Sequence, residues 1–376
     1  MARQCTGVLC VLLLAAVAQA TTHTGRAAEV RGRLLVDVYL DGRGPYPFLL
    51  DAALKRPVID TRLAADLHLP IAQDPAMGET PGGAAITAPV AYIHQFQVAP
   101  GLENDETVAV MDLAAATARL GRPVAGLLPA YQAGLEITLQ FDPPGVTWRT
   151  LDEAVMQEGG DDAIPIKIGA SGAPEFEVLL DGRYVRTLQL DLSLGGDLAL
   201  SEDTLADLGD DPARTVLTTR LSTGEVERQV RLKSLKVGKA ELLQPIAAIQ
   251  GANGGDRVGL GFLKRHGVTL SYEFGRMYLA VTQPRFSAPP LAGYGLTLEG
   301  VIDGYWVLGV AAGSPAEQAG IVPGDRLLSV ESRRLYQAGY ANVAGLLEAT
   351  EGQVIALTVL QHGEPAPFTL TAAPLL

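Results

Sequence analysis

Val38-Tyr39-Leu40-Asp41-Gly42-Arg43 and Val178-Leu179-Leu180-Asp181-Gly182-Arg183 are two copies of one pattern, an apolar strand followed by an Asp-Gly turn. Ten residues after each turn aspartate, a second apolar strand ends in another aspartate, which is Asp51 in the first copy and Asp191 in the second. The turn aspartates and the strand-end aspartates are both offset by 140 residues. A constant offset of this kind predicts an internal duplication.

Further matches follow in the same order in both copies. Leu63–Leu67 is echoed by Leu205–Leu208, and the apolar segment Gly126–Leu139 is echoed by Val258–Leu270. The apolar runs are short, alternating and β-branched, and Asp-Gly and Gly-Gly turns separate them, which is typical of β-strands. The sequence therefore predicts a mainly β chain with two tandem lobes. The few helical patterns are short and lie at Thr61–His68, Thr204–Leu208 and Leu263–His266.

Two segments rich in glycine or proline divide the chain. The acidic segment 151–162 carries a short helical pattern before Gly159-Gly160, and the segment 283–290 contains three prolines. Both compositions are typical of linkers. The predicted organisation is a leader over residues 1–20, a first lobe over 28–150, a second lobe over 163–282 and a C-terminal module over 291–376.

The first 20 residues have the pattern of a secretory signal peptide. A single basic residue, Arg3, precedes an apolar stretch from Gly7 to Ala18, and Ala18-Gln19-Ala20 supplies small residues for cleavage. A short membrane anchor is an alternative, but about a dozen apolar residues are too few to span a bilayer. Lipidation of Cys10 is a second alternative. We expect an exported protein, periplasmic or secreted, without stable membrane insertion after cleavage.

The composition argues against several classes of function. Cys5 and Cys10, the only cysteines, lie in the predicted leader, so the mature chain has no disulfide, thiol nucleophile or thiolate metal site. The net charge of −13 argues against binding to nucleic acid. The five histidines are isolated, which argues against a zinc hydrolase. We therefore expect neither a metal nor a cofactor.

The layout of each lobe resembles the retropepsin-like aspartic peptidases. The resemblance covers residues 30–282 and includes the closing motif Asp256–Leu263. In that family each lobe presents one aspartate from an Asp-Thr/Ser-Gly turn. The two carboxylates share a proton, so that one polarises the carbonyl while the other activates water. The resemblance implies that Asp51 and Asp191 form this dyad within a single chain, as a monomer acting on a polypeptide substrate.

Both aspartate motifs depart from the family pattern. The chain has Asp51-Ala52-Ala53 and Asp191-Leu192-Ser193, so it lacks the hydroxyls that would bond the two loops together and the glycines that allow a close backbone approach. Pro129 lies near the position of the first lobe's closing glycine and removes a donor. We predict impaired catalysis. Two alternatives stay open, an active endopeptidase and aspartates that merely end strands at turns.

Each lobe also has a glycine-bearing segment that could form a flap, a mobile hairpin over a bound peptide. These segments are Met77–Gly83 and Leu221–Glu225, with candidate tips Gly82-Gly83 and Thr223-Gly224. Both follow their aspartate by some 30 residues. Glycine-rich tips suit a moving hairpin, although an ordinary exposed turn needs the same residues.

The C-terminal segment Gly313–Val330 resembles the signature of bacterial PDZ domains. Ser314 and Pro315 predict the start of a short helix, and Gly320 predicts its end in a left-handed cap. The following Gly324-Asp325 predicts a turn into a strand. The resemblance implies a small β module that binds an extended peptide.

The same resemblance places a groove in this module. Gly293-Tyr294-Gly295-Leu296 resembles the loop that binds a terminal carboxylate through consecutive N–H groups. The strand Leu296–Val301 would accept the peptide as an added β-strand, against a helix over Ala341–Ala349 that carries Asn342 and Leu346. We predict recruitment of a peptide or protein C-terminus to the lobe pair. A PDZ fold with a shielded groove is the alternative.

Overall fold

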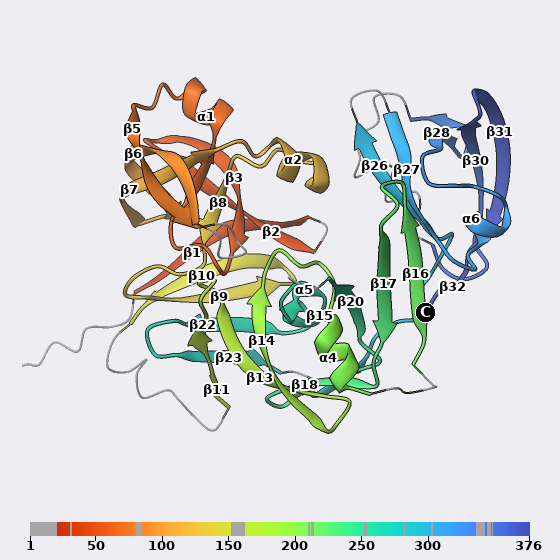
Figure 1. Cartoon of the computed structure of the whole chain (residues 1–376). Coiled ribbons are helices and arrows are strands. Elements are labelled where there is room, and N and C mark those ends of the chain that lie inside the picture. Colours follow the sequence, from red (N-terminus) through yellow and green to blue (C-terminus); the bar gives the residue numbers. More distant parts are fainter. Residues whose placement is uncertain are drawn as a thin grey trace, which may run out of the picture.

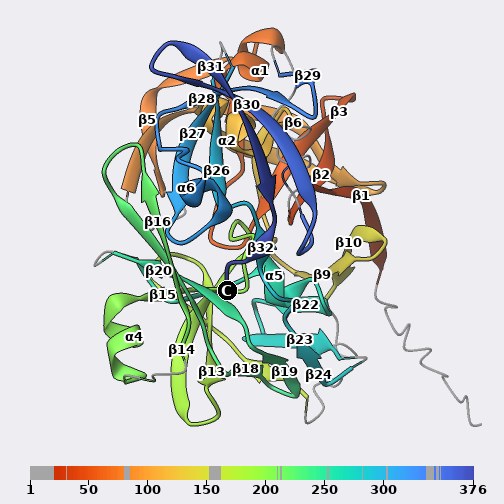
Figure 2. The same ribbon diagram turned by 90° about the vertical axis from the view of Figure 1, so that its right-hand side faces the viewer.

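The computed structural model shows a mainly β chain in which two barrel lobes are stacked and the C-terminal module lies beside them (Figures 1 and 2). It describes residues 21–376 except 31, 80–84, 152–161, 210, 212–213, 252–253, 282, 302–303, 336–342, 344–346 and 348. The predicted leader, residues 1–20, lies outside the described residues. Within the described part no helix is long and apolar enough to cross a membrane.

The first lobe is a closed barrel of six strands. In order around the barrel these are β2 (Arg33–Leu40), β3 (Arg43–Asp51), β8 (Gly126–Pro129), β4 (Val58–Asp60), β7 (Leu102–Met111) and β6 (Ala85–Ala99), with β6 returning to β2. The hairpin partner of β6 is β5 (Ile71–Glu79), and the helices are α1 (Thr61–Asp66) and α2 (Ala114–Leu120). The predicted helix at Thr61–His68 is α1, whereas α2 is not among the predicted helices.

The second lobe repeats this order of pairing. Its strands are β13 (Pro174–Leu180), β14 (Tyr184–Asp191), β21 (Arg257–Gly259), β15 (Leu198–Ser201), β20 (Ile246–Gln250), β17 (Val226–Arg231), β18 (Ser234–Val237) and β19 (Ala240–Leu243). The pair β17 and β18 replaces the single long strand β6, because β18 pairs with β13 as β6 pairs with β2. The hairpin partner of β17 is β16 (Val216–Leu221), and the helices are α4 (Glu202–Asp207) and α5 (Leu260–Leu263).

The two repeated Asp-Gly turns have a structural role that is the same in both lobes. Asp41 and Asp181 both adopt positive φ, 47° and 51°, a conformation that aspartate tolerates better than most residues. The Asp41 carboxylate accepts a hydrogen bond from Gln95 N at 2.9 Å. The Asp181 carboxylate accepts from Lys233 N at 2.7 Å. Each aspartate thus bonds its hairpin to the chain segment that crosses the turn. This contact helps to close the barrel.

A six-stranded sheet joins the lobes. Its strands are, in order, β11 (Ile164–Pro165), β23 (Arg276–Ala280), β22 (Gly267–Ser271), β9 (Leu135–Phe141), β10 (Pro144–Thr150) and β1 (Thr22–Val30). At its centre β9 of the first lobe pairs with β22 of the second. One face of this sheet, which includes Ile137, Trp148 and Leu270, is buried in a core that is continuous through both lobes.

The C-terminal module has a core of its own, which includes Tyr294, Val307 and Val359. The predicted cap is present, since the Ser314 side chain accepts a hydrogen bond from Glu317 N and Gly320 has a φ of 87°. Its elements are β25 (Ala292–Gly293), β26 (Leu296–Val301), β27 (Gly304–Ala311), α6 (Pro315–Gln318), β28 (Arg326–Val330), β29 (Arg333–Arg334), β30 (Val354–Gln361), β31 (Glu364–Thr371) and β32 (Ala373–Pro374). The remaining short strands of the chain are β12 (Lys167–Ile168), which pairs with β13, and β24 (Arg285–Ser287), which pairs with β19.

Replacing each turn aspartate by alanine tests the barrel-closing role. Both variants place alanine at a positive φ, so the difference between them reports on the hydrogen bonds. The Asp181 side chain is 5% exposed and also accepts from Ser234 N and Arg214, whereas Asp41 is exposed with one such bond to the crossing strand. We expect Asp181→Ala to lower the free energy of unfolding in urea by about 1–2 kcal/mol more than Asp41→Ala. Equal losses would contradict this role.

Candidate functional site

The two strand-end aspartates occupy equivalent positions. Asp51 is the last residue of β3 and pairs in parallel with Pro129, and Asp191 is the last residue of β14 and pairs in parallel with Gly259. Pro129 therefore stands in the first lobe where the second lobe has its closing glycine. The negative charge of Asp191 is close enough to affect the ionisation of Asp51. The structure thus brings the two predicted residues into one site.

Asp51 is buried, with 6% of its surface exposed. Burial raises the pKa of its carboxyl to about 6, the hydrogen bond that Ala53 N donates at 2.8 Å opposes this rise, and the charge of Asp191 adds to it. Below that pH Asp51 is mostly a neutral acid, able to donate a hydrogen bond.

Asp191 is held in a different way. Its Oδ1 accepts hydrogen bonds from Ser193 N at 2.8 Å, Ser193 Oγ at 2.6 Å and Leu194 N at 3.1 Å. Its Oδ2 forms an ion pair with the Arg257 guanidinium at 2.9 Å. Arg257 in turn donates to the Gln250 side-chain oxygen at 3.2 Å. A guanidinium and three donors all favour the ionised carboxylate.

Contacts between the lobes hold the aspartate loops in place of the missing hydroxyls. The buried phenol of Tyr272, in the second lobe, donates to Ala52 O at 3.2 Å. Arg33 Nε, in the first lobe, donates to Ser193 O at 2.7 Å. The sequence does not predict these contacts, because both residues come from outside the aspartate motifs. Each lobe thus fixes the other's loop without a threonine or serine after the aspartate.

This geometry limits the chemistry of the pair. In the shared-proton mechanism the ionised carboxylate must take a proton from the attacking water. Both oxygens of Asp191 already accept from protein donors, and one of them faces a cation. The site therefore combines a buried acid with a neutralised carboxylate, which differs from a symmetric dyad. Among the described residues no group of three or more His, Cys, Asp or Glu could hold a metal ion.

The structure describes the second predicted flap but not the tip of the first. Gly82-Gly83, the tip of the first, lies outside the described residues. The second candidate is a hairpin of β16 and β17 with Thr223-Gly224 at its tip, where Gly224 has a φ of 85°. This hairpin does not stand free, because β16 pairs with β27 of the C-terminal module.

The structure describes the predicted carboxylate loop of the module, and main-chain hydrogen bonds hold this loop in place. Gly293 and Tyr294 are buried, while Gly295 and Leu296 are half-buried. Ala316 N donates to Tyr294 O at 3.0 Å and Ala311 N donates to Gly295 O at 2.9 Å. Both carbonyls are thus occupied within the module.

The groove helix is described only in part. The predicted groove residues Asn342 and Leu346 lie outside the described residues, whereas Val343 and Leu347 are helical.

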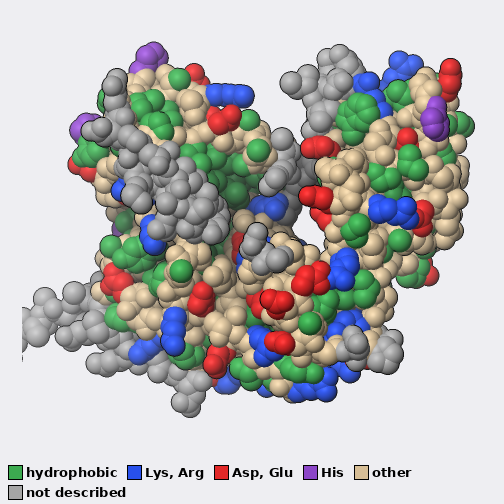
Figure 3. Space-filling view, viewed as in Figure 1, with side chains coloured by type: hydrophobic (Ala, Val, Ile, Leu, Met, Phe, Trp, Pro, Cys, Tyr) green, Lys and Arg blue, Asp and Glu red, His purple; other side chains and the backbone are tan. Residues whose placement is uncertain are grey.

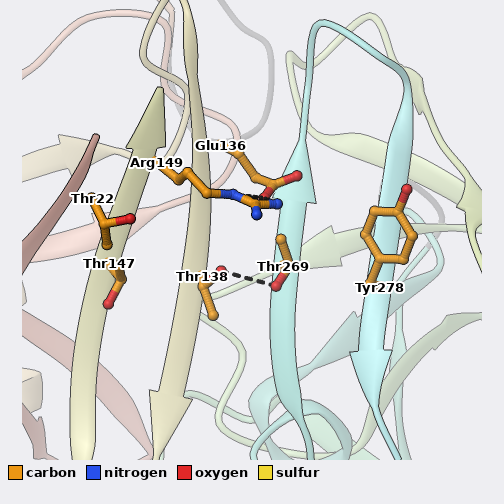
Figure 4. A pocket seen from close by; sticks show the side chains of 7 residues that line it. All are labelled: Thr22, Glu136, Thr138, Thr147, Arg149, Thr269 and Tyr278. Carbon is orange, nitrogen blue, oxygen red and sulfur yellow. Dashed lines mark hydrogen bonds and ion pairs between the residues drawn. The ribbon is translucent and has the colours of Figure 1, made fainter. Parts of the chain in front are cut away.

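The surface of the described residues has several concave regions. Figure 3 shows a hollow between the first lobe and the C-terminal module. A second pocket lies on the face of the six-stranded sheet opposite to the core, and Figure 4 shows its polar lining. There the Glu136 carboxylate pairs with Arg149 at 2.7 Å and the Thr138 and Thr269 hydroxyls are 2.9 Å apart. The full lining is Thr22, Glu136, Thr138, Thr147, Arg149, Thr269 and Tyr278.

Comparison with known families agrees with this architecture. Residues 36–129 match the family described as aspartyl protease, and residues 306–361 match the family described as PDZ domain. The chain joins an aspartyl protease domain to a PDZ domain. Both parts of the resemblance drawn from the sequence are confirmed, as is the mainly β fold class. The two domains support a peptidase-like protein with a peptide-binding module, and a PDZ domain implies binding of a peptide C-terminus.

Comparison over the whole chain finds weak similarity to a solved structure. The chain is similar to the crystal structure of basic 7S globulin from soybean, with 10% sequence identity and a TM-score of 0.41. The match covers 70% of this chain and 95% of the globulin chain. No curated protein matches the chain.

The raised pKa of Asp51 predicts a specific dependence of stability on pH. In the unfolded chain this carboxyl ionises near 3.8, but in the folded protein it ionises near 6. The stabilisation that the protonated form provides is therefore complete below pH 3.8 and is lost as the pH rises to 6. Relative to the Asp51→Asn variant, in which position 51 no longer titrates, the wild type should lose about 3 kcal/mol of unfolding free energy over that range. Urea unfolding of both proteins between pH 3.5 and 7 measures this, and parallel curves would contradict it.

Proposed function

We propose that this protein is an exported, monomeric peptide-binding protein that recruits polypeptide C-termini through its PDZ domain and holds them at an aspartyl protease-like body without cleaving them. The observation that carries this proposal is the ion pair between Arg257 and Asp191, at 2.9 Å. Export is proposed from the signal-peptide pattern of residues 1–20, and the monomeric state from the presence of both lobes in one chain.

The ion pair matters because catalysis needs binding that is stronger in the transition state than in the ground state. A water between the two aspartates would need a free carboxylate oxygen as base. Three donors occupy Oδ1 of Asp191, and the one lone pair left on Oδ2 lies beside the Arg257 guanidinium, whose positive charge makes this oxygen a poor base. The two strand-end aspartates keep equivalent places in an aspartyl protease-like body, and we propose that this body binds an extended chain.

An active aspartic endopeptidase is the second candidate. The pKa of Asp51, about 6, and the contribution of Asp191 to that value favour it, because one protonated and one ionised carboxyl is the state that the mechanism requires. In this alternative Asp51 would polarise the carbonyl and Asp191 would activate water after Arg257 had moved away.

Digestion of unfolded casein between pH 4 and 7 separates the two functions. Because the Arg257 guanidinium makes Asp191 Oδ2 a poor base, we expect no cleavage by the wild type, and no difference from the Asp51→Asn and Asp191→Asn variants. A pepsin-like enzyme assayed on the same casein serves as the positive control. Cleavage that either substitution abolishes would establish the peptidase and overturn the proposal.

Recruitment of C-termini has its own test. The probe is a pool of fluorescent decapeptides with randomised last four residues and a free terminal carboxylate, and the control is the same pool with an amidated terminus. Amidation removes the charge that consecutive N–H groups would bind, so we expect at least about tenfold weaker binding of the amide pool in fluorescence anisotropy. Gly295→Val should weaken the carboxylate pool similarly, because a Cβ there would overlap Ser314. Equal binding of both pools would exclude this mode of recognition.

A further inference from the structure

The hairpin of β16 and β17 is part of the PDZ sheet as well as of the second lobe. β16 pairs antiparallel with β27, with Thr219 opposite Ala311 and Leu221 opposite Gly309. At the two ends of this ladder, Ala312 N donates to Thr218 O and Ser222 N donates to Leu308 O, both at 2.7 Å. The junction is therefore made by main-chain hydrogen bonds, which fix the register of two elements about 90 residues apart in sequence.

Side chains reinforce the same junction. Gly309 lacks the Cβ that would lie 2.8 Å from Leu221 Cδ2 and 2.9 Å from Thr219 Cγ2, so its small size allows the hairpin to approach. Arg220 forms an ion pair with Glu317 of α6 at 2.8 Å. At the base of the hairpin, Arg231 donates to Leu376 O at 2.9 Å. The hairpin is held to the PDZ domain at its tip, its middle and its base.

The other edge of β27 carries the strand that a ligand would extend. β26 pairs with β27 from Leu296 to Val301, on the edge opposite to β16 and β28. Figure 1 shows β26 on the side of the PDZ domain that faces the first lobe, with β30 and β31 on the far side. In Figure 2 the same β30 and β31 lie nearest the viewer. A peptide added to β26 would therefore extend a sheet that continues through β27 into the hairpin.

The hairpin also leads back to the aspartate site. In the order of elements it corresponds to the β5–β6 hairpin of the first lobe, because each follows the strand-end aspartate and the next helix of its lobe. β17 pairs with β20, with Arg228 opposite Ile249. The next residue, Gln250, accepts a hydrogen bond from Arg257, which pairs with Asp191. A continuous series of bonded elements thus joins the PDZ groove strand to Asp191.

We propose that the PDZ domain controls this hairpin, so that peptide capture in the PDZ groove stiffens the hairpin and, through β20 and Gln250, the Arg257–Asp191 pair. The proposal rests on the proposed function, since it requires peptide binding by the PDZ domain. The hairpin pairs with β20 of the second lobe on one side and with β27 of the PDZ domain on the other. A peptide on β26 restricts β27, and the shared ladder passes this restriction to β16 and β17. Capture of a chain terminus and stiffening of the hairpin are then one coupled event.

Hydrogen–deuterium exchange of the full chain tests this coupling. The probe is the free-carboxylate decapeptide pool at saturation, and the amidated pool is the control. The amides of residues 226–229 in β17 are the readout, because this strand pairs with β16 and β20 and not with the PDZ sheet. We expect the carboxylate pool to slow their exchange at least about fivefold. The same pool should have no such effect on a Gly309→Val variant, whose added side chain separates the junction.

The outcomes distinguish the two proposals. If the carboxylate pool binds but exchange at residues 226–229 does not change, the coupling is overturned and the proposed function stands. If the pool does not bind at all, the proposed function is overturned, and the coupling with it. Slower exchange in the wild type but not in Gly309→Val supports the coupling.

A disulfide provides a second test that does not depend on a disruptive variant. The two hydrogen bonds at the ends of the ladder make Thr219 and Ala311 a non-hydrogen-bonded pair, whose Cα atoms are about 4.5 Å apart and can be bridged. In a background with Cys5→Ser and Cys10→Ser, the Thr219→Cys/Ala311→Cys protein has no other cysteine. Because coupling is reciprocal, the oxidised form should bind the carboxylate pool about fivefold more tightly than the reduced form. Equal affinities would overturn the proposal.

Discussion

The pairing of β9 with β22 is the contact on which the site depends. These strands meet at the centre of the six-stranded sheet, where the Thr138 and Thr269 hydroxyls are 2.9 Å apart across the boundary between the lobes. Each barrel alone would present one aspartate at the end of a strand. The shared sheet and the continuous core beneath it hold the two lobes together, so that the charge of Asp191 acts on Asp51.

The two lobes share a backbone but differ in electrostatics. Both aspartates end a strand that pairs in parallel with a closing strand, and both accept a hydrogen bond from the backbone N–H two residues on. Asp51 is then buried without a cation, so its carboxyl stays protonated up to a pKa of about 6. Asp191, by contrast, pairs with the Arg257 guanidinium at 2.9 Å. In a peptidase the two carboxyls exchange the roles of acid and base. In this pair each carboxyl has its own fixed surroundings, burial for Asp51 and the Arg257 guanidinium for Asp191.

Much of the architecture could be predicted from the sequence, because it depends on local patterns. The repeated Asp-Gly turns indicate the duplication, and the structure shows why both aspartates are present, since each closes a barrel. Arg257 lies inside the closing motif, but its reach to Asp191 follows from the parallel register of β14 and β21, which no local pattern gives. The junction of β16 with β27 is made by main-chain hydrogen bonds. The Arg220–Glu317 ion pair that reinforces it joins residues 97 apart in sequence, which no local pattern predicts. Tyr272 and Arg33 act across the lobe boundary, far from the motifs whose loops they hold.

The central claim is that the body binds a polypeptide without stabilising a transition state. Its most direct measurement compares two sets of octapeptides that differ at one backbone unit, an ordinary amide in one and a tetrahedral secondary alcohol in the other. A catalytic dyad binds the tetrahedral form far more tightly, by a factor of 100 or more. The account predicts equal affinities for the two sets within about threefold, in the wild type and in Asp51→Asn. Tighter binding of the alcohol set by about 100-fold, lost in Asp51→Asn, would contradict it.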